Sequence, residues 1–170
     1  MDNIIAFTAE YLFIIVVGLA VLYILYMVLR RRASLLEAII ALVVIGGTSY
    51  LLSKLGTNLV SSPRPFVETG VPPLISSATD NGFPSDHTLL LATVAAVVTI
   101  VDRRVGFVLW LIALLIGLAR VYARVHHLLD VIGSFGMVLI AVLIYLAVRK
   151  LWQTYAQPRL TKASSNNPDS

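Results

Sequence analysis

The stretch YLFIIVVGLAVLYILYMVL, residues 11–29, carries no charged side chain and is followed directly by RRR at 30–32. A bilayer core about 30 Å thick needs roughly 20 residues of helix, so this stretch is long enough to cross it. The rest of the chain agrees with that reading, since 58% of its 170 residues are hydrophobic and 13% are charged. Its mean hydropathy is +0.88. We therefore expect an integral membrane protein rather than a soluble domain.

Further apolar runs follow and predict an all-α fold, a polytopic transmembrane helical bundle of about five spans. They cover residues 33–52, 88–101, 105–119 and 128–148. The third span is short unless residues 85–87 form its first turn, and residues 1–10 suit a short interfacial helix. Small residues within 46–49, 92–96 and 133–136 allow helices to approach closely in lipid, which predicts a compact bundle.

The segment between the second and third runs has a different composition. Residues 56–84 hold five of the seven prolines, which predicts an ordered or semi-ordered loop rather than a span. Residues 157–170 are polar and rich in Ser, Asn and Pro, so we expect a disordered tail after one membrane domain, residues 1–156. The chain has no cysteine, which excludes disulfides, thiolate chemistry and a cysteine-built zinc site.

The basic residues predict how the bundle is oriented. If the spans alternate, nine of the thirteen Lys and Arg residues lie at the ends of the first, third and fifth spans or in the tail. The positive-inside tendency makes that side cytoplasmic and places the N-terminus outside, and topology alone explains these charges. The outer side then holds Lys54, Arg64, Arg120, Arg124 and all three histidines. Ionisable groups at such positions in a membrane chain suggest a functional site.

Three polar pieces make up this outer cluster: PRP at 63–65, PSDH at 84–87, and the set Arg120, His126 and Asp130. Each piece has a simpler explanation when taken alone. Arg64 could be a rigid loop residue between two prolines, and Ser85 could be a helix N-cap. His126 and Asp130, four residues apart, could be a structural pair on one helix face.

Taken together, the pieces suit the binding of a phosphate group. Arg64 and Arg120 offer forked donors that match phosphate oxygens. Ser85 adds a hydroxyl at a helix N-terminus, where backbone N–H groups and the positive end of the dipole also favour an anion. The two guanidinium groups can neutralise charge as a metal ion does elsewhere, so we expect neither a metal nor a cofactor.

The remaining residues of the cluster suit phosphoryl transfer. A histidine held by a carboxylate one turn away, His126 with Asp130, is an oriented imidazole that can attack phosphorus. A second histidine, His87, can give a proton to the leaving oxygen and later take one from water.

The three pieces resemble the signature motifs of the type 2 phosphatidic acid phosphatase (PAP2) superfamily of membrane phosphatases. The matching residues are PRP at 63–65, FPSDH at 83–87 and the pattern R-x5-H-x3-D from Arg120 to Asp130. The resemblance covers residues 54–136, and the joint spacing is far more specific than any single motif. It implies a PAP2/haloperoxidase-like helical fold and a phosphohistidine intermediate on His126, which satisfies both spacings where its neighbour His127 does not.

Two departures from the family pattern affect the predicted phosphate contacts. The family places a lysine seven positions before the motif arginine, and here Thr57 stands at that position. Lys54 lies about one helical turn earlier and is the candidate to replace it. Ala119 precedes Arg120 where the family often has serine, which removes one hydroxyl.

The residue after Ser85 bears on the substrate. Asp86 stands where many family members have glycine, and this variant resembles a bacterial branch that acts on undecaprenyl diphosphate, the lipid carrier of cell-wall synthesis. Arg124 is a further candidate contact for the second phosphate, although a lipid-headgroup or loop-packing role explains it equally well.

The resemblance therefore implies a lipid phosphatase of the bacterial plasma membrane, active at the outer face and connected with cell-wall biogenesis and bacitracin resistance. Its partners are the lipid diphosphate and the membrane, and no nucleic acid is expected. Two alternatives stay open: a phosphatase for phosphatidylglycerol phosphate or phosphatidate, and a non-catalytic lipid-phosphate binder or transporter. The sequence leaves the oligomeric state undetermined.

Overall fold

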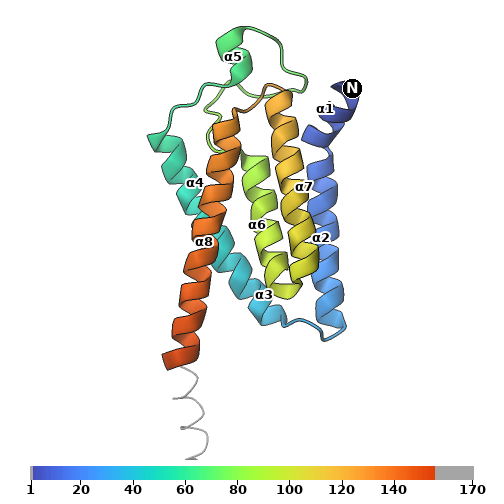
Figure 1. Cartoon of the computed structure of the whole chain (residues 1–170), viewed down its shortest axis with the longest axis vertical. Coiled ribbons are helices and arrows are strands. Elements are labelled where there is room, and N and C mark those ends of the chain that lie inside the picture. Colours follow the sequence, from blue (N-terminus) through green and yellow to red (C-terminus); the bar gives the residue numbers. More distant parts are fainter. Residues whose placement is uncertain (1, 156–170) are drawn as a thin grey trace, which may run out of the picture.

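The computed structural model describes residues 2–155 and shows helices and loops, with no strand in that range. The predicted tail, residues 157–170, lies outside the described residues. The elements are α1 (Asp2–Glu10), α2 (Leu12–Leu29), α3 (Leu35–Ala41), the π-helical turn η1 (Leu42–Gly46), α4 (Gly47–Leu59), α5 (Pro65–Thr69), α6 (Asp86–Val101), α7 (Arg103–Tyr122) and α8 (Leu128–Tyr155). The long helices form a bundle, which confirms the expected all-α class (Figure 1).

The apolar helices agree in number with the five expected spans. Four are long and apolar enough to cross a membrane, namely α2, the continuous rod α3–η1–α4, α7 and α8, and α6 is a shorter fifth one. Several boundaries differ from the prediction by a few residues, and two of them bear on the site. The second helix ends at Leu59 rather than Leu52, because backbone hydrogen bonding continues where the side chains turn polar. The third begins at Asp86, so Ser85 precedes the helix rather than joining its first turn.

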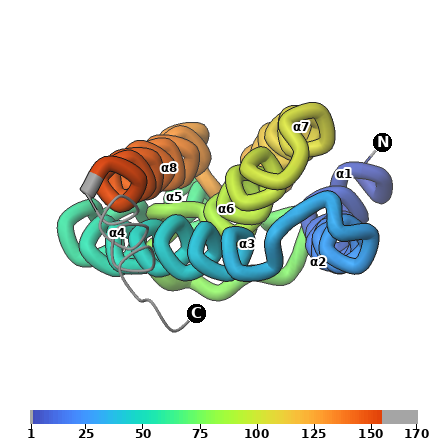
Figure 2. Tube along the Cα trace, turned by 90° about the horizontal axis from the view of Figure 1, so that it is seen from below, coloured from blue at the N-terminus to red at the C-terminus, as the bar shows by residue number. Residues whose placement is uncertain are grey.

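The central helix of the bundle is α6. It contacts α2, α3, η1, α7 and α8, and Figure 2 shows it between α7, α8 and the α3–α4 rod. Ala92, Ala95 and Ala96 are buried on it, which agrees with the predicted close approach of helices at small residues. Its 16 residues rise only about 24 Å, less than a bilayer core. Because neighbouring helices surround it, its buried polar side chains, Thr88 and Thr93, are covered by protein rather than lipid.

The end of the bundle opposite α5 is tied together by two polar contacts. The hydroxyl of Tyr23 on α2 donates to Oδ2 of Asp102 at 2.7 Å, and Asp102 also caps the first amides of α7. The Tyr23 hydroxyl, followed by a backbone amide, holds the pKa of the Asp102 carboxyl below its usual value. Arg149 on α8 pairs with Glu37 on α3 at 2.7 Å. These contacts join α2, α3, α7 and α8 at the end farthest from the loop with the prolines.

The other end carries α1 and the loop of residues 60–85 (Figure 1). This loop contains α5, which ends at Gly70 with φ +68°, a left-handed conformation that glycine adopts without steric cost. The short N-terminal helix expected from the sequence is present as α1. Its Ala9 is buried in a cluster with Ile75 of the loop and with Ala123 and Val125, which follow α7. The loop is therefore packed against the bundle and against α1.

Candidate active site

Polar side chains from three distant segments meet at this end of the bundle. They come from the loop before α5, the start of α6, and the end of α7 with the connection into α8. Five of them are at most 8% exposed: Arg64, Ser85, Arg120, His126 and Asp130. Buried polar and charged groups of this kind are stable only with hydrogen-bond partners or a bound ligand. The contacts below show how each one is held.

His126 is oriented through Nδ1, while its Nε2 lies beside an arginine. Its Nδ1 lies 2.9 Å from the carbonyl oxygen of Gly82 and 3.5 Å from Oδ2 of Asp130. Both neighbours are acceptors, so Nδ1 carries the proton and Nε2 keeps its lone pair. Nε2 lies 3.5 Å from Nη1 of Arg64. The ring is thus fixed with a nucleophilic nitrogen beside a guanidinium group, and the Gly82 carbonyl is a closer partner of Nδ1 than the expected carboxylate.

Asp130 is fully buried in the first turn of α8 and is held by donors from two directions. Its Oδ1 accepts from the hydroxyl of Ser62 at 2.9 Å, and its Oδ2 accepts from the backbone N–H of His127 at 2.8 Å. These bonds stabilise the ionised carboxylate and fix its direction toward His126. Asp130 therefore connects the loop before α5 with His126.

Arg64 lies over the same histidine. Its Nη1 donates to the carbonyl oxygen of Val125 at 2.9 Å, and its Nε and Nη2 donate to Oδ1 of Asp80 at 3.0 and 2.9 Å. Its backbone is extended, with φ −68° and ψ 145°, between two prolines. The backbone of Arg64 is therefore rigid, as expected for a loop residue between two prolines, and its charged side chain is also directed at His126.

Ser85 precedes α6 at the N-cap position, but its side chain makes no capping hydrogen bond within the described part of the chain. Its hydroxyl oxygen instead accepts from Oγ1 of Thr88 at 3.1 Å. Its backbone N–H donates to the carbonyl oxygen of Asp130 at 3.3 Å, and its own carbonyl accepts from Ser134. Because the Ser85 oxygen is the acceptor in the contact with Thr88, its own proton can be donated to an anion at the helix N-terminus.

His87 follows in the first turn of α6 and is half-buried. Its ring packs against Phe13 of α2 with the ring centroids 4.5 Å apart. It lies two residues after the buried Ser85, at the same end of α6 as the other polar side chains of the cluster. A weakly solvated imidazole in this position can exchange a proton with a group bound between the arginines.

Arg120 lies in the last turn of α7 and is held from outside the three motifs. Its Nη1 donates to the carbonyl oxygen of Ala9 in α1 at 3.2 Å. Its buried Nε has no hydrogen-bond partner among residues 2–155. The acidic groups that act electrostatically on it are Asp86 and Glu10. A buried guanidinium with an unused N–H is suited to bind an oxyanion by donating to it. The side chain of Asp86, at the start of α6, is exposed.

The structure directs Lys54 away from this cluster. Lys54 is exposed on α4, and its ammonium lies 5.4 Å from the ring centroid of Tyr50, one turn further from the loop. Thr57, which stands at the family's lysine position, donates its hydroxyl to the carbonyl oxygens of Ser53 and Phe83. The Thr57 side chain therefore holds the backbone just before the PSDH segment by a hydrogen bond to Phe83.

Two other candidates are engaged in loop contacts. Arg124 adopts φ +65° and donates to the carbonyl oxygen of Pro72 at 3.0 Å, which is the loop-packing role left open by the sequence. His127 places its Nε2 at 3.1 Å from both Oε2 of Glu68 and the carbonyl oxygen of Pro63. The side chain of His127 therefore points toward α5, while that of its neighbour His126 points into the buried cluster.

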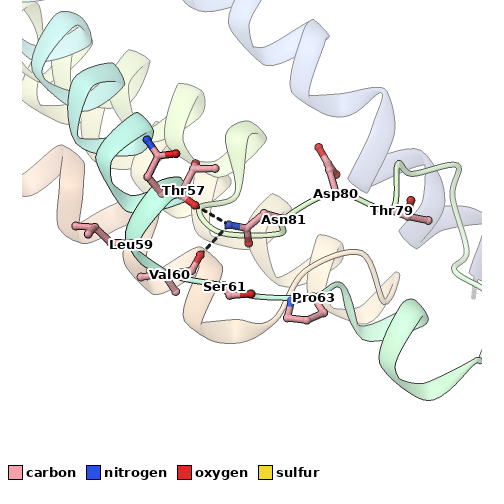
Figure 3. Close-up of a pocket in the computed structure, with 9 residues that line it drawn as sticks. Thr57, Leu59, Val60, Ser61, Pro63, Thr79, Asp80 and Asn81 are labelled. Atoms are coloured by element: carbon pink, nitrogen blue, oxygen red, sulfur yellow. Dashed lines mark hydrogen bonds between the residues drawn. The ribbon is translucent and has the colours of Figure 1, made fainter.

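Asn81 connects the segments that carry the motifs. Its Nδ2 donates to the carbonyl oxygens of Thr57 and Val60, as Figure 3 shows, and its Oδ1 accepts from the amides of Ser62 and Phe83. It lines a cavity of about 410 Å³ between the end of α4 and the loop, together with Thr57, Pro63, Asp80 and neighbouring residues (Figure 3). This cavity lies beside the buried cluster, and the nucleophilic histidine is not among its lining residues.

Sequence reasoning missed four residues that hold the site: Ser62, Asp80, Asn81 and Gly82. Their only sequence signal is position, since Ser62 precedes the PRP motif and the other three precede FPSDH. Gly82 is favoured by close approach, because a Cβ there would lie only 3.1 Å from both Oδ2 of Asp130 and the carbonyl oxygen of Ser62. These contacts form because two segments of the loop, around residue 62 and at residues 80–82, lie against the start of α8. No local sequence pattern predicts that arrangement.

Comparison with known proteins identifies the family of the chain. Residues 35–154 match the PAP2 superfamily, and this range includes all three motif segments and every span except α2. The match therefore covers most of the chain, including the residues that surround His126.

Two curated bacterial proteins are similar along most of their length. The bacitracin transport permease protein BcrC of Bacillus licheniformis is 31% identical over 154 residues, covering 89% of this chain and 73% of the relative. The undecaprenyl-diphosphatase BcrC of Bacillus subtilis (strain 168) is 30% identical over 140 residues, covering 82% and 70%. One relative is thus named for transport and the other for phosphatase activity.

Proposed function

Because the chain belongs to the PAP2 superfamily of membrane phosphatases, we propose that it removes the terminal phosphate of undecaprenyl diphosphate and leaves undecaprenyl phosphate. The observation that carries this proposal is the state of His126. Its Nδ1 is held by the Gly82 carbonyl and Asp130, and its Nε2 stands 3.5 Å from Nη1 of Arg64. An imidazole fixed in this way, with a positive group beside the free nitrogen, is suited to attack a phosphorus atom.

The proposed reaction has two steps. In the first, Nε2 of His126 attacks the terminal phosphorus, a phosphorus–nitrogen bond forms, and the bond to the bridging oxygen breaks. His87 gives its proton to that oxygen, so undecaprenyl phosphate leaves. In the second, His87 takes a proton from water, the oxygen attacks phosphorus, and the phosphorus–nitrogen bond breaks to release inorganic phosphate and free His126.

Charge stabilisation in both steps comes from groups that are already in place. Arg64 and Arg120 neutralise the phosphoryl oxygens, and the Ser85 hydroxyl with the N-terminus of α6 adds further donors. These groups lie at a buried position, where they interact with a phosphate more strongly than they would in water. We therefore propose that the reaction proceeds without a metal ion.

The substrate proposal rests on two features. The Asp86 variant of the PSDH segment resembles the bacterial undecaprenyl-diphosphate branch, and a relative 30% identical to this chain is named undecaprenyl-diphosphatase. A long isoprenoid tail also fits a site at the end of a helical bundle, because the headgroup can bind there while the tail remains in the bilayer. Within the same class, phosphatidylglycerol phosphate and phosphatidate are the competing substrates.

We further propose that the site faces the outside of a bacterial plasma membrane. The turn after α2, the turn between α6 and α7, and the end of α8 lie at the end away from α5 (Figure 1). Those segments carry most of the basic residues: Arg30, Arg31, Arg32, Arg103, Arg104, Arg149 and Lys150. The positive-inside tendency makes that end cytoplasmic and the site extracytoplasmic. Cysteine labelling tests this directly, since the chain has no native cysteine; labelling from outside at residue 103 would reverse the orientation.

A transport or binding role is the second candidate, favoured by the name of the Bacillus licheniformis relative. A binding protein and an enzyme would place different requirements on His126. A binder needs the two arginines and the helix N-terminus, but it gains nothing from an imidazole whose free nitrogen is oriented by a buried carboxylate. The geometry around His126 therefore favours turnover over binding alone.

The test is phosphate release by the purified protein in detergent with EDTA present, using undecaprenyl diphosphate, phosphatidylglycerol phosphate and phosphatidate. We expect the diphosphate to be preferred and His126→Ala to lower the turnover number roughly a thousandfold or more while substrate binding persists. His127→Ala is the matched control and should keep activity within about threefold, because its side chain contacts α5. Full activity in His126→Ala, or complete dependence on a divalent ion, would refute the mechanism.

A further inference from the structure

Arg64 is held by a carboxylate that belongs to none of the three motifs. Its Nε and Nη2 both donate to the same oxygen, Oδ1 of Asp80, at 3.0 and 2.9 Å. The two side chains differ in exposure, with Arg64 9% and Asp80 67% accessible. The pair thus joins a buried guanidinium to a carboxylate on the surface of the loop.

The bonds leave one edge of the guanidinium available. Of its five N–H groups, the Nε–H and one on Nη2 point to Asp80, and one on Nη1 points to the carbonyl of Val125. The second N–H of Nη2 has no acceptor among residues 2–155, while Nη1 is also within hydrogen-bond distance of Nε2 of His126. The end-on edge between Nη1 and Nη2 can therefore bind two oxygens of a phosphate once Nη1 exchanges the histidine for the phosphate. Nη1 lies 3.5 Å from Nε2 of His126, so this edge is next to the nucleophile.

We propose that Asp80 is a positioning residue that fixes the guanidinium of Arg64 with its end-on edge directed at the phosphoryl group attacked by His126. This inference rests on the proposed phosphate site and adds a residue to it. Arg64 has a rigid backbone between two prolines, but its long side chain retains rotatable bonds that only contacts along the guanidinium can fix. Asp80 and the Val125 carbonyl supply those contacts from two sides.

The position of Asp80 is itself fixed by its neighbour. Asn81 donates to the carbonyl oxygens of Thr57 and Val60, which anchors the loop to the end of α4 (Figure 3). The carboxylate of Asp80 therefore extends from an anchored segment. An exposed carboxylate on a free loop could not hold an arginine to the same precision.

The alternative role for the same contact is a latch, in which Asp80 occupies the place of the phosphate and must be displaced. A latch would have to cover the end-on edge beside His126. Asp80 instead covers the side edge formed by Nε and Nη2. The two roles predict opposite effects when the carboxylate is removed, because loss of a latch strengthens anion binding and loss of a positioning contact weakens it.

The test uses orthovanadate, a tetrahedral phosphate analogue, titrated into the purified full-length protein in detergent. We expect Asp80→Ala to weaken vanadate binding about tenfold, the size typical of losing one charge-assisted contact. Asp80→Asn should stay within about twofold of the unmodified protein, since both bonds go to one oxygen and an amide oxygen can accept them. Thr79→Ala, an exposed neighbour on the same loop, is the control and should change nothing.

Each outcome decides between the roles. Unchanged or tighter vanadate binding by Asp80→Ala overturns the proposal, and so does Asp80→Asn behaving like Asp80→Ala. Equal thermal unfolding midpoints for the Asp80 and Thr79 variants separate positioning from a general loss of folding. If the unmodified protein binds vanadate but cleaves none of the lipid phosphates, the proposed function fails while the Asp80 series still holds. If it does not bind vanadate, the phosphate site and this inference both fall.

Discussion

The hydroxyl of Ser62 provides the sharpest test of how the site is held together. It donates to Oδ1 of Asp130 at 2.9 Å, and Asp130 is fully buried and lies 3.5 Å from Nδ1 of His126. Ser62→Ala removes this donor without changing the backbone. Hydrogen bonds to charged groups contribute about 1.5–3 kcal/mol. Ser62 is only partly buried, so water can replace part of the interaction, and the lower end of that range applies.

A loss of about 1.5 kcal/mol in the transition state corresponds to roughly a tenfold lower rate. We expect this loss in the turnover number, with the Michaelis constant nearly unchanged, because Ser62 supports the nucleophile rather than the phosphate contacts. The assay is the initial rate of phosphate release from undecaprenyl diphosphate in detergent. Ser61→Ala is the matched control, since Ser61 is the exposed neighbour with the same side chain. If Ser62→Ala stays within twofold of Ser61→Ala, the carboxylate does not act through this contact and the reasoning is wrong.

Two further perturbations test how the fold supports the site. Gly133→Ala places a methyl group against the ring of Phe83, with its Cβ 2.6 Å from Cζ, and overpacking of this kind should lower the free energy of unfolding by about 1–3 kcal/mol. Gly136→Ala, where a Cβ meets nothing within 4 Å, should be neutral or slightly stabilising, and equal thermal unfolding midpoints for the two variants would contradict the packing described here. Deletion of α1 removes the Ala9 carbonyl that accepts from Arg120, so vanadate binding should weaken several-fold. Unaltered binding would show that α1 does not help to position that arginine.

The fold could be predicted well from the sequence because the bilayer imposes a length on every span. Long apolar runs have few alternatives in lipid, and they predict all five helices, four of which are long enough in the structure to cross a membrane. The boundaries were less certain. The α3–η1–α4 rod continues to Leu59 through Ser53, Lys54 and Thr57, where polarity alone suggested a loop. Helix ends depend on backbone geometry and capping, which an apolar pattern does not report.

The central residues of the candidate site could also be predicted, because phosphoryl transfer needs a particular set of side chains. Arg64, Ser85, Arg120, His126 and Asp130 were chosen by residue type and spacing, and the structure buries all five at one end of the bundle. For Lys54 and Arg124, only the three-dimensional structure shows whether the side chain contacts the site. Lys54 lies against Tyr50, and Arg124 binds the Pro72 carbonyl. Spacing along the chain cannot tell such contacts from contacts in the site.

The sequence by itself therefore determined a membrane helical bundle of the PAP2 superfamily, and it predicted an orientation from the basic residues and a set of site residues around His126. Only the tertiary structure decided what holds His126 in place. The carbonyl oxygen of Gly82 is nearer to Nδ1 of His126 than the expected carboxylate is. Ser62 donates a hydrogen bond to Asp130, and Asp80 accepts hydrogen bonds from Arg64. The physical reason is that hydrogen bonds act over about 3 Å in space regardless of separation in sequence. Such partners become visible only when the loop before α6 lies against the start of α8.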